Sequence, residues 1–158
     1  MITVTKCGPT FNQWSDLLAL IQKAYAYMED RIDPPSSMHK LTKSLLQQKA
    51  KDETLLLALE KDRLIGCAFV REQEDSFYIG KLAVDTSQQG QGIGQQIIHA
   101  CIQLANEADK PDLELETRIE LLENHAFFSL MGFKKTAENA HKGYDQPTSI
   151  TMQRPGKP

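Results

Sequence analysis

The sequence predicts an α/β domain whose mixed, mostly antiparallel central sheet is flanked by helices, in the order β-α-α-β-β-β-α-β-α-β-β. Three observations support this prediction. Several segments place apolar residues at helical spacing, three short strand-like runs follow one another in the middle of the chain, and a glycine-rich turn joins the last run to a helix. The length of 158 residues suits one compact domain, so we expect residues 1–158 to fold as a single unit.

The first third of the chain predicts one strand and two helices. Residues 2–5 carry β-branched side chains and are typical of a short strand, which a Gly-Pro pair ends. Thr10 and Gln13 match a capping box, so we expect a helix from Thr10 to near Glu29. A loop with two adjacent prolines follows, and a leucine stripe predicts a second helix over residues 38–50.

The middle of the chain predicts an antiparallel meander. Strand-like runs occupy residues 54–60, 64–71 and 77–84, and short polar turns connect them. Residues 88–94 are rich in glycine and lead into a strongly amphipathic helix. The apolar stripe of that helix is predicted to consist of Ile93, Ile97, Cys101, Leu104 and Ala108.

The last third predicts a strand, a helix and two closing strands. Residues 113–117 are expected to form the strand, and the helix over residues 122–131 is expected to end at Gly132, which occupies a C-cap position. Residues 133–136 and 148–152 indicate the closing strands, which a polar loop joins.

Composition argues against several classes of protein. Hydrophobic residues make up 41% and charged residues 25% of the chain, as in ordinary soluble domains. The net charge of -3 lacks the basic surplus of nucleic-acid binders, so no nucleic-acid partner is expected. No apolar run has the length of a membrane span, so we expect a cytoplasmic protein without a membrane partner. The three cysteines and the histidines share no ligand spacing, so no metal site is expected.

The segment with the clearest chemistry is the glycine-rich turn. Gly90, Gly92 and Gly94 let a ligand approach the backbone without obstruction by a Cβ atom. The start of the following helix adds unpaired N–H groups and a partial positive charge, which together suit a pyrophosphate. The spacing is not that of a P-loop, because no Gly-Lys-Ser/Thr follows. It is not a dinucleotide fingerprint either, because the preceding strands predict an antiparallel meander.

The turn resembles the acetyl-CoA motif of the GNAT superfamily of N-acetyltransferases, written Q/R-x-x-G-x-G/A, with Gln89, Gly92 and Gly94 in its fixed positions. In that family the turn binds the pyrophosphate of acetyl-CoA, and the preceding strand pairs with the pantetheine arm. The resemblance implies the GNAT acyl-CoA acyltransferase fold with acetyl-CoA as co-substrate. The implied cofactor contacts are those of Leu82, Ala83, Val84, Gln89, Gly90, Gln91, Gly92, Ile93, Gly94 and Gln95.

Two later segments extend the resemblance. Residues 115–118 are similar to the fifth strand of the family, and residues 127–133 to its second signature, in which a helix ends in Gly-Phe. Many members carry Asn where Leu121 stands and Tyr where Phe128 stands. We expect Asn124 to take over the bond to pantetheine and Phe128 to line the cofactor site, although its ring cannot donate a proton.

The resemblance implies direct transfer of the acetyl group to a primary amine. A base must take a proton from the ammonium, and Glu116 stands where relatives that acetylate protein N-termini carry a catalytic glutamate. The N–H of Val84 would stabilise the developing oxyanion. Because Phe128 cannot act as the acid, the alternatives are that the leaving thiolate takes its proton from Tyr144, Tyr78 or water, or that it leaves without an acid, since it is a tolerable leaving group.

Residues on the acceptor side also have structural alternatives. Strand alternation places Glu114, Glu116 and Arg118 on one face, where an exposed ion-pair ladder is the alternative to a catalytic base. The segment after the first helix could bind a carboxylate or draw in a cationic amine, or it could be a solvated helix end. Its candidate substrate residues are Tyr27, Glu29 and Arg31.

The sequence leaves the acceptor open. A small-molecule or peptide amine is expected, but its identity, the preferred acyl chain and the presence of a homodimer are not determined. Leu121 and Phe128 motivate an alternative function, a non-catalytic acyl-CoA-binding sensor or partner module.

Overall fold

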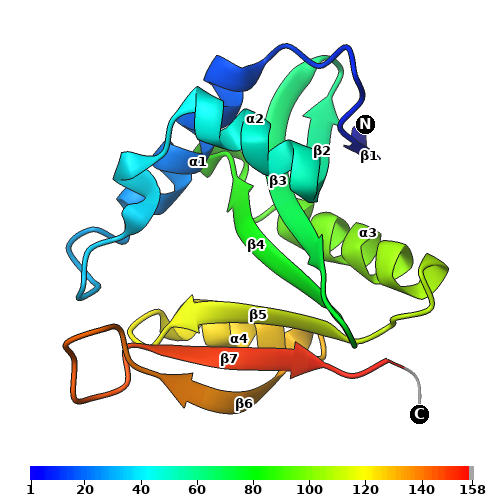
Figure 1. Ribbon diagram of the computed structural model, residues 1–158. Coiled ribbons are helices and arrows are strands. Elements are labelled where there is room, and N and C mark those ends of the chain that lie inside the picture. The colour runs from blue at the N-terminus through cyan, green and yellow to red at the C-terminus, as the bar shows by residue number, and fades with distance from the viewer. Residues whose placement is uncertain (157–158) are drawn as a thin grey trace.

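The computed structural model describes residues 1–156, apart from the side chain of His39. Over this part of the chain one seven-stranded sheet has the order β1-β2-β3-β4-β5-β7-β6 (Figure 1). β4 and β5 are parallel, and the other neighbouring strands are antiparallel. The strands are β1 (Ile2–Lys6), β2 (Thr54–Glu60), β3 (Arg63–Glu72), β4 (Phe77–Val84), β5 (Leu113–Arg118), β6 (Lys134–Asn139) and β7 (Ser149–Arg154).

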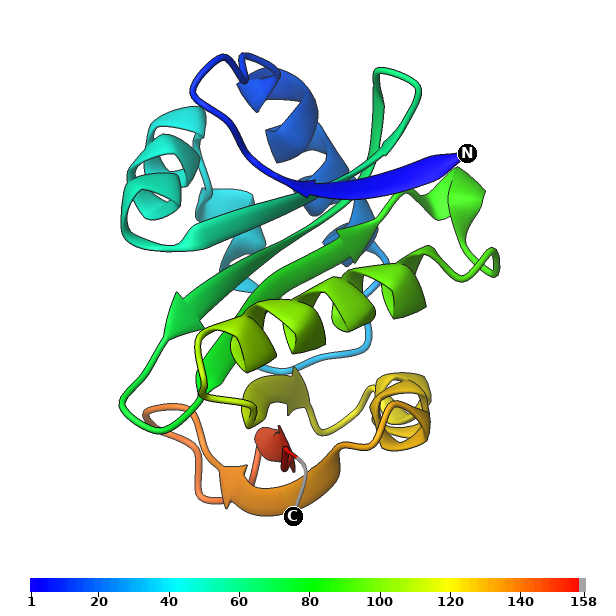
Figure 2. The ribbon, with the colours of Figure 1, turned by 90° about the vertical axis from the view of Figure 1, so that its right-hand side faces the viewer.

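Helices cover both faces of the sheet. α1 (Trp14–Ala26) and α2 (Lys43–Asp52) lie on one face, where Leu17 and Leu46 join a buried cluster with β2 and β3. α3 (Ile93–Glu107) and α4 (Leu122–Leu130) lie on the other face (Figure 2). They contribute Ile97 and Phe128 to a second buried cluster with the strands. The predicted α/β class, with its mixed and mostly antiparallel sheet, is therefore confirmed.

α1 begins later than the sequence predicts. The expected capping box at Thr10 is wrong, because Gln13 is the N-cap and its side chain makes no capping bond. Phe11 instead packs edge-to-face on Trp14, with ring centroids 4.9 Å apart, after a turn in which the N–H of Phe11 donates to Gly8. Aromatic packing thus occupies the residues that would have formed the first helical turn.

The predicted second helix over residues 38–50 is divided in two. A short 3-10 helix, η1 (Ser37–Lys40), precedes α2, and the extended backbone of Leu41 and Thr42 separates them. The hydroxyl of Thr42 accepts a hydrogen bond from the N–H of Leu45 at 3.1 Å. Thr42 is therefore the N-cap that fixes where α2 begins.

Other corrections concern which residues are buried and where strands end. On α3 the buried residues are Ile93, Ile97, Ile98, Cys101 and Ala105, and Leu104 is partly buried against the same cluster. The predicted stripe was therefore wrong at its last member, Ala108, which is exposed. β6 begins only after the buried Phe133 and ends later than predicted. Gly132, at φ 97°, ends α4 as predicted. Within residues 1–156, no helix has both the length and the apolar character needed to cross a membrane.

Candidate active site

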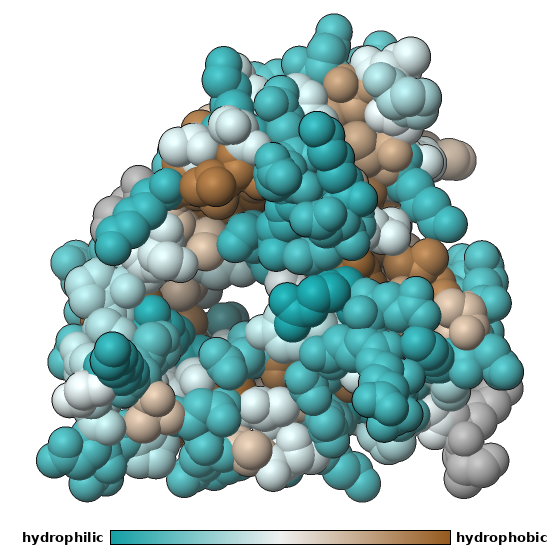
Figure 3. All heavy atoms as spheres, in the orientation of Figure 1, coloured by the Kyte–Doolittle hydropathy of each residue, from teal (hydrophilic) through white to brown (hydrophobic). Residues whose placement is uncertain are grey.

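β4 and β5 part from one another inside the sheet. Phe77 pairs with Leu113 and Tyr78 with Glu114, and beyond these two pairs the strands diverge (Figure 1). The space between them opens into a cleft of about 1050 Å³. Figure 3 shows that the surface is hollowed where the two parts of the sheet separate. Because strands that part leave backbone N–H and C=O groups unpaired, the walls of the cleft offer hydrogen bonds to an extended ligand.

The backbone N–H of Val84 faces this cleft. The next N–H along the strand, that of Asp85, donates to Ile65 of β3 at 2.8 Å. Successive N–H groups of a strand point to opposite edges, so that of Val84 points away from β3 and toward β5. In the same wall the carbonyl of Leu82 accepts a hydrogen bond of 2.8 Å from the hydroxyl of the partly buried Tyr25, which ties α1 to β4.

The glycine-rich turn forms one end of the cleft. Gly90 and Gly92 have φ values of 85° and 79°, in the left-handed region that favours glycine, and a Cβ atom on either would meet nothing within 4 Å. Gly92 is the N-cap of α3, whose first N–H groups have no carbonyl partner within the helix. The turn therefore presents open backbone and a helix N-terminus to the cleft, as an anion site requires.

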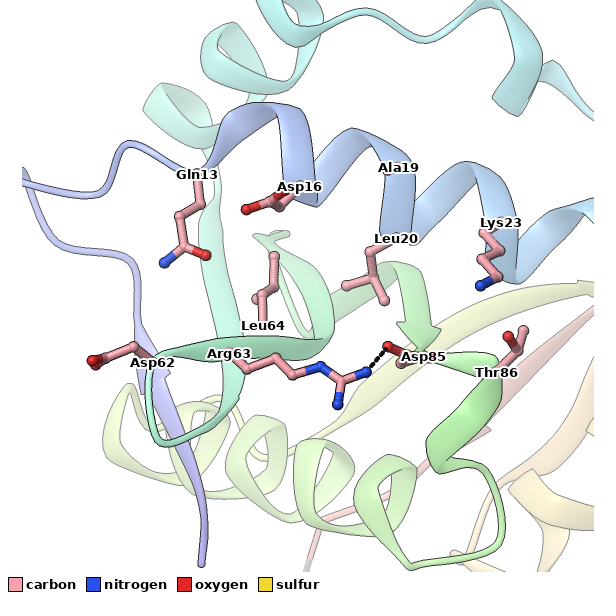
Figure 4. A pocket seen from close by; sticks show the side chains of 10 residues that line it. All are labelled: Gln13, Asp16, Ala19, Leu20, Lys23, Asp62, Arg63, Leu64, Asp85 and Thr86. Carbon is pink, nitrogen blue, oxygen red and sulfur yellow. Dashed lines mark hydrogen bonds and ion pairs between the residues drawn. The ribbon is translucent and has the colours of Figure 1, made fainter.

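Asp85 anchors the start of this turn. Its carboxylate accepts a hydrogen bond of 2.9 Å from the N–H of Ser87 and pairs with Arg63 at 3.1 Å (Figure 4). These interactions, with the backbone bond from Ser87 as the largest, lower the pKa of Asp85. A smaller cavity of about 430 Å³ lies beside Asp85, between α1 and the start of β3.

Replacing Asp85 by alanine should destabilise the turn. We expect the free energy of unfolding to fall by about 1 kcal/mol, because a capping acceptor is lost. Asp62→Ala is the control, since Asp62 lines the smaller cavity but is exposed. Because the pKa of Asp85 is lowered in the folded protein, its carboxylate stabilises the fold at pH values above the ordinary pKa of Asp. The loss of unfolding free energy in Asp85→Ala should therefore become smaller as the pH falls through the lowered pKa. Urea titrations at neutral and acidic pH would measure this, and equal deficits at both would contradict it.

Glu116 lies on the opposite wall. It is exposed and lines the cleft, and it accepts a hydrogen bond of 3.2 Å from the side chain of Asn139. The neighbours proposed for an ion-pair ladder have other partners: Glu114 accepts from Gln153, and Arg118 donates to the carbonyl of Pro34 at 2.7 Å. Glu116 thus lines the cleft with a neutral side chain, Asn139, as its hydrogen-bond partner, and its position is one that a general base could occupy.

The two residues that depart from the family motif, Phe128 and Leu121, both make buried apolar contacts. Phe128 is 7% exposed and packs against the rings of Phe127 and Phe133, with centroids 5.3 and 5.8 Å away. Leu121 is 1% exposed and belongs to a small cluster with Met28 and Ile32. Both side chains also line the cleft, so apolar packing explains the residue types at these positions.

The cleft brings together most of the predicted site residues. Asn124 lines it, and its side-chain amide donates to the hydroxyl of Thr117 at 3.5 Å. Tyr27 lines it too, and burial is the main cause of its raised pKa. Arg31 also lines it, but its guanidinium forms a two-point ion pair with Glu123, one bond measuring 2.8 Å. The predicted site residues found in the lining are Leu82, Ala83, Val84, Gln89, Gly90, Gly92, Ile93, Gly94, Gln95, Glu116, Asn124, Phe128, Tyr27 and Arg31.

Three predicted site residues lie elsewhere in the described structure. Gln91 and Glu29 are exposed and are not part of the cleft lining. The hydroxyl of Tyr144 donates to Asp33 at 2.6 Å, outside the lining, and this bond raises the pKa of Tyr144. Tyr78 lines the cleft, and burial is the main cause of its raised pKa.

Sequence reasoning missed two lysines in the cleft. Lys49 of α2 and Lys81 of β4 both line it, on the side covered by α1 and α2. A signal for Lys81 exists, because it is the one charged residue in an otherwise apolar and aromatic strand. Lys49 gave no such signal, since it is one of several lysines in the polar sequence of α2. Among residues 1–156, no group of three or more His, Cys, Asp or Glu side chains is arranged to hold a metal ion.

Solved structures share this fold along nearly the whole chain. The paia N-acetyltransferase from Thermoplasma acidophilum, in complex with coenzyme A, has a TM-score of 0.83 at 13% identity and 98% coverage of both chains. A GNAT family acetyltransferase from Elizabethkingia anophelis with acetyl-CoA bound has a TM-score of 0.71 at 22% identity and 97% coverage of both chains. The ribosomal-protein-S18-alanine N-acetyltransferase from Escherichia coli has a TM-score of 0.69 at 18% identity, covering 98% of this chain and 94% of its own.

Sequence comparison identifies the family directly. A search of curated proteins gave no match. The sequence model of the acetyltransferase (GNAT) family matches residues 14–133, a range that runs from the start of α1 to the end of the second signature and includes the whole glycine-rich turn. This chain belongs to the GNAT family of acetyltransferases.

Proposed function

We propose that this protein transfers the acetyl group of acetyl-CoA directly to a primary amine of a small molecule or peptide. The observation that carries the proposal is the parting of β4 and β5 beside an open glycine-rich turn. A pyrophosphate would bind the N–H groups of the turn. The pantetheine arm would extend along the unpaired edge of β4, as an added strand does.

The chain supplies groups for the transfer itself. The N–H of Val84 faces the cleft and would donate to the thioester oxygen as negative charge develops there. Glu116 on the facing wall would accept a proton from the acceptor ammonium. The neutral amine then attacks the thioester carbon, the carbon–sulfur bond breaks to release the thiolate of coenzyme A, and the attacking nitrogen loses its second proton to water as the amide forms. Tyr78 or a water molecule in the cleft would return a proton to the sulfur, because Phe128 has none to give.

Acetyl-CoA should bind at the glycine-rich turn with an affinity that depends on Gly92. We expect Gly92→Asp to weaken binding at least about 100-fold in calorimetric titration, because a carboxylate would face the pyrophosphate. Gly143→Asp is the matched control: Gly143 has φ 88° and open space around a Cβ atom, but it lies outside the cleft lining. Equal affinities of the two variants would contradict a pyrophosphate site at the turn.

Enzyme assays would then separate catalysis from binding alone. Release of free thiol from acetyl-CoA that depends on an added amine would support the transferase. Tight binding of acetyl-CoA without turnover on any amine would favour the non-catalytic acyl-CoA-binding module instead. Phe128 motivates this second function, because its ring is buried in apolar contacts and has no proton to donate.

A further inference from the structure

Lys81 places a positive charge in the wall of the cleft. It lies where the register between β3 and β4 shifts, and its φ of 51° is unusual for a residue other than glycine. The side chain is partly buried and lines the cleft. Within residues 1–156, no hydrogen bond or ion pair reaches its ammonium group.

The surroundings of Lys81 do not neutralise this charge. Burial is the larger cause of the lowered pKa of Lys81, and the positive charge of nearby Lys49 lowers this pKa further. The one carboxylate that raises this pKa is that of Glu53, which already pairs with Lys49 at 2.6 Å and is 10% exposed. Two ammonium groups therefore share one carboxylate in a partly buried place, which favours an additional anion.

The phosphates of acetyl-CoA are not placed to be that anion. Cys67, whose thiol donates to the carbonyl of Lys81, is buried in the cluster formed with α1 and α2. The glycine-rich turn leads into α3, which packs on the opposite face of the sheet. Lys49 and Lys81 thus lie on the α1–α2 side, away from the turn that would hold the pyrophosphate.

An acidic group lies across the cleft from the two lysines. Glu116 is near enough to Tyr78 to raise its pKa, and Glu53 influences both Tyr78 and Lys81. Glu116 on β5 and Lys81 on β4 both line the cleft, so its two walls carry a carboxylate and an ammonium group. An acceptor with a positive group at one end and a negative group at the other would match this distribution of charge.

We infer that the acceptor is a primary amine that also carries a carboxylate or phosphate, which Lys81 binds with help from Lys49 while the amine faces Glu116. The inference rests on the proposed acetyl transfer and specifies its substrate class. The anionic group of such an acceptor would neutralise the unpaired ammonium of Lys81. Because the acceptor would be held at both ends, its amine would be oriented toward the base.

Matched acceptors test this inference. We would compare each L-amino acid with its carboxamide, and O-phosphoethanolamine with ethanolamine, by following thiol release from acetyl-CoA. The anionic member of a pair should have a kcat/KM about 10- to 100-fold higher, the range expected for a hydrogen bond between charged groups. The amino-acid and phosphate pairs distinguish which anion is preferred.

Variants locate the effect at the lysines. Lys81→Met should remove the preference for the anionic member, and Lys49→Met should reduce it. Lys51→Met, at an exposed position of α2, should leave it unchanged. The acetyl-CoA affinity of each variant should match that of the unmodified protein, which shows that the fold and the donor site are intact. Lys49→Met leaves Glu53 without its ion-pair partner, so it is assayed well below its melting temperature.

Several outcomes would overturn the inference. One is an equal kcat/KM for both members of every pair. A second is a preference for the anionic acceptor that persists in Lys81→Met. A third is turnover of neutral amines alone, which would contradict the inferred substrate class but still support acetyl transfer. A protein that binds acetyl-CoA but acetylates no member of the panel would also overturn it. Failure to bind acetyl-CoA at all would instead remove the proposed function.

Discussion

Replacing Glu116 by glutamine should lower kcat for acetyl transfer by about 10²- to 10⁴-fold, the usual contribution of a general base. The amide keeps the size of the side chain and can still bond to Asn139, but it cannot take the proton from the ammonium. Binding of acetyl-CoA should not change, because the residues predicted to contact acetyl-CoA lie on β4, the glycine-rich turn and α4, and Glu116 is on β5. Steady-state kinetics with a fixed amine, together with calorimetry, would measure both effects.

The pH dependence of this variant separates a base from a structural group. Without Glu116, transfer should depend on the fraction of acceptor that is already neutral, so the rate should continue to rise with pH up to the pKa of the amine. Glu114→Gln is the control, because Glu114 bonds to Gln153 and is not part of the cleft lining. If Glu116→Gln and Glu114→Gln have the same activity, the base lies elsewhere, and His141, which lines the cleft, becomes the residue to replace.

Truncating Phe133 to alanine should cost about 3–5 kcal/mol of unfolding free energy, the range for removing a buried aromatic ring. Phe133 is 2% exposed and joins α4 to the sheet through its contact with Phe128. Leu130→Ala is the matched control: Leu130 ends the same helix but is 88% exposed, so its loss should change stability by less than about 0.5 kcal/mol. Chemical denaturation of the three proteins would measure the difference.

The same variant also tests how the site is supported. Loss of the Phe133 ring should loosen Phe128 in the cleft wall, so acetyl-CoA should bind more weakly even where the variant is fully folded. A Phe133→Ala protein with an unchanged free energy of unfolding would show that α4 does not depend on this packing. An unchanged affinity for acetyl-CoA would show that the cleft does not depend on it.

Local patterns predicted the sheet and the turn well. The predicted strands at residues 54–60 and 77–84 coincide with β2 and β4, because short apolar runs and the tight turns between them depend on neighbours in sequence. The helix starts were predicted less well. The packing of Phe11 on Trp14 overrode a capping box, and the hydroxyl of Thr42 created a cap where a continuous stripe had been expected.

The site was predictable only where its chemistry is local. Gly90 and Gly92 could be recognised because their function needs only their own backbone and the helix that follows. Arg31 could not be assessed, since its partner Glu123 is distant in sequence. Tyr144 was expected in the site, but a bond to Asp33 holds it outside the cleft lining. The charge balance around Lys81 likewise exists only after β3, β4 and α2 have assembled.

The divergence of β4 and β5 has a consequence for how the protein unfolds. Only two residue pairs connect these strands, so the sheet contains a seam between the β1–β4 part and the β5–β7 part. A ligand that bonds to both walls would couple the two parts and raise the free energy of opening the seam. Hydrogen exchange of backbone amides along the seam should therefore become slower when a ligand fills the cleft, and the two parts should unfold more cooperatively. The interruption that admits a ligand thus makes the cooperativity of the whole domain depend on that ligand.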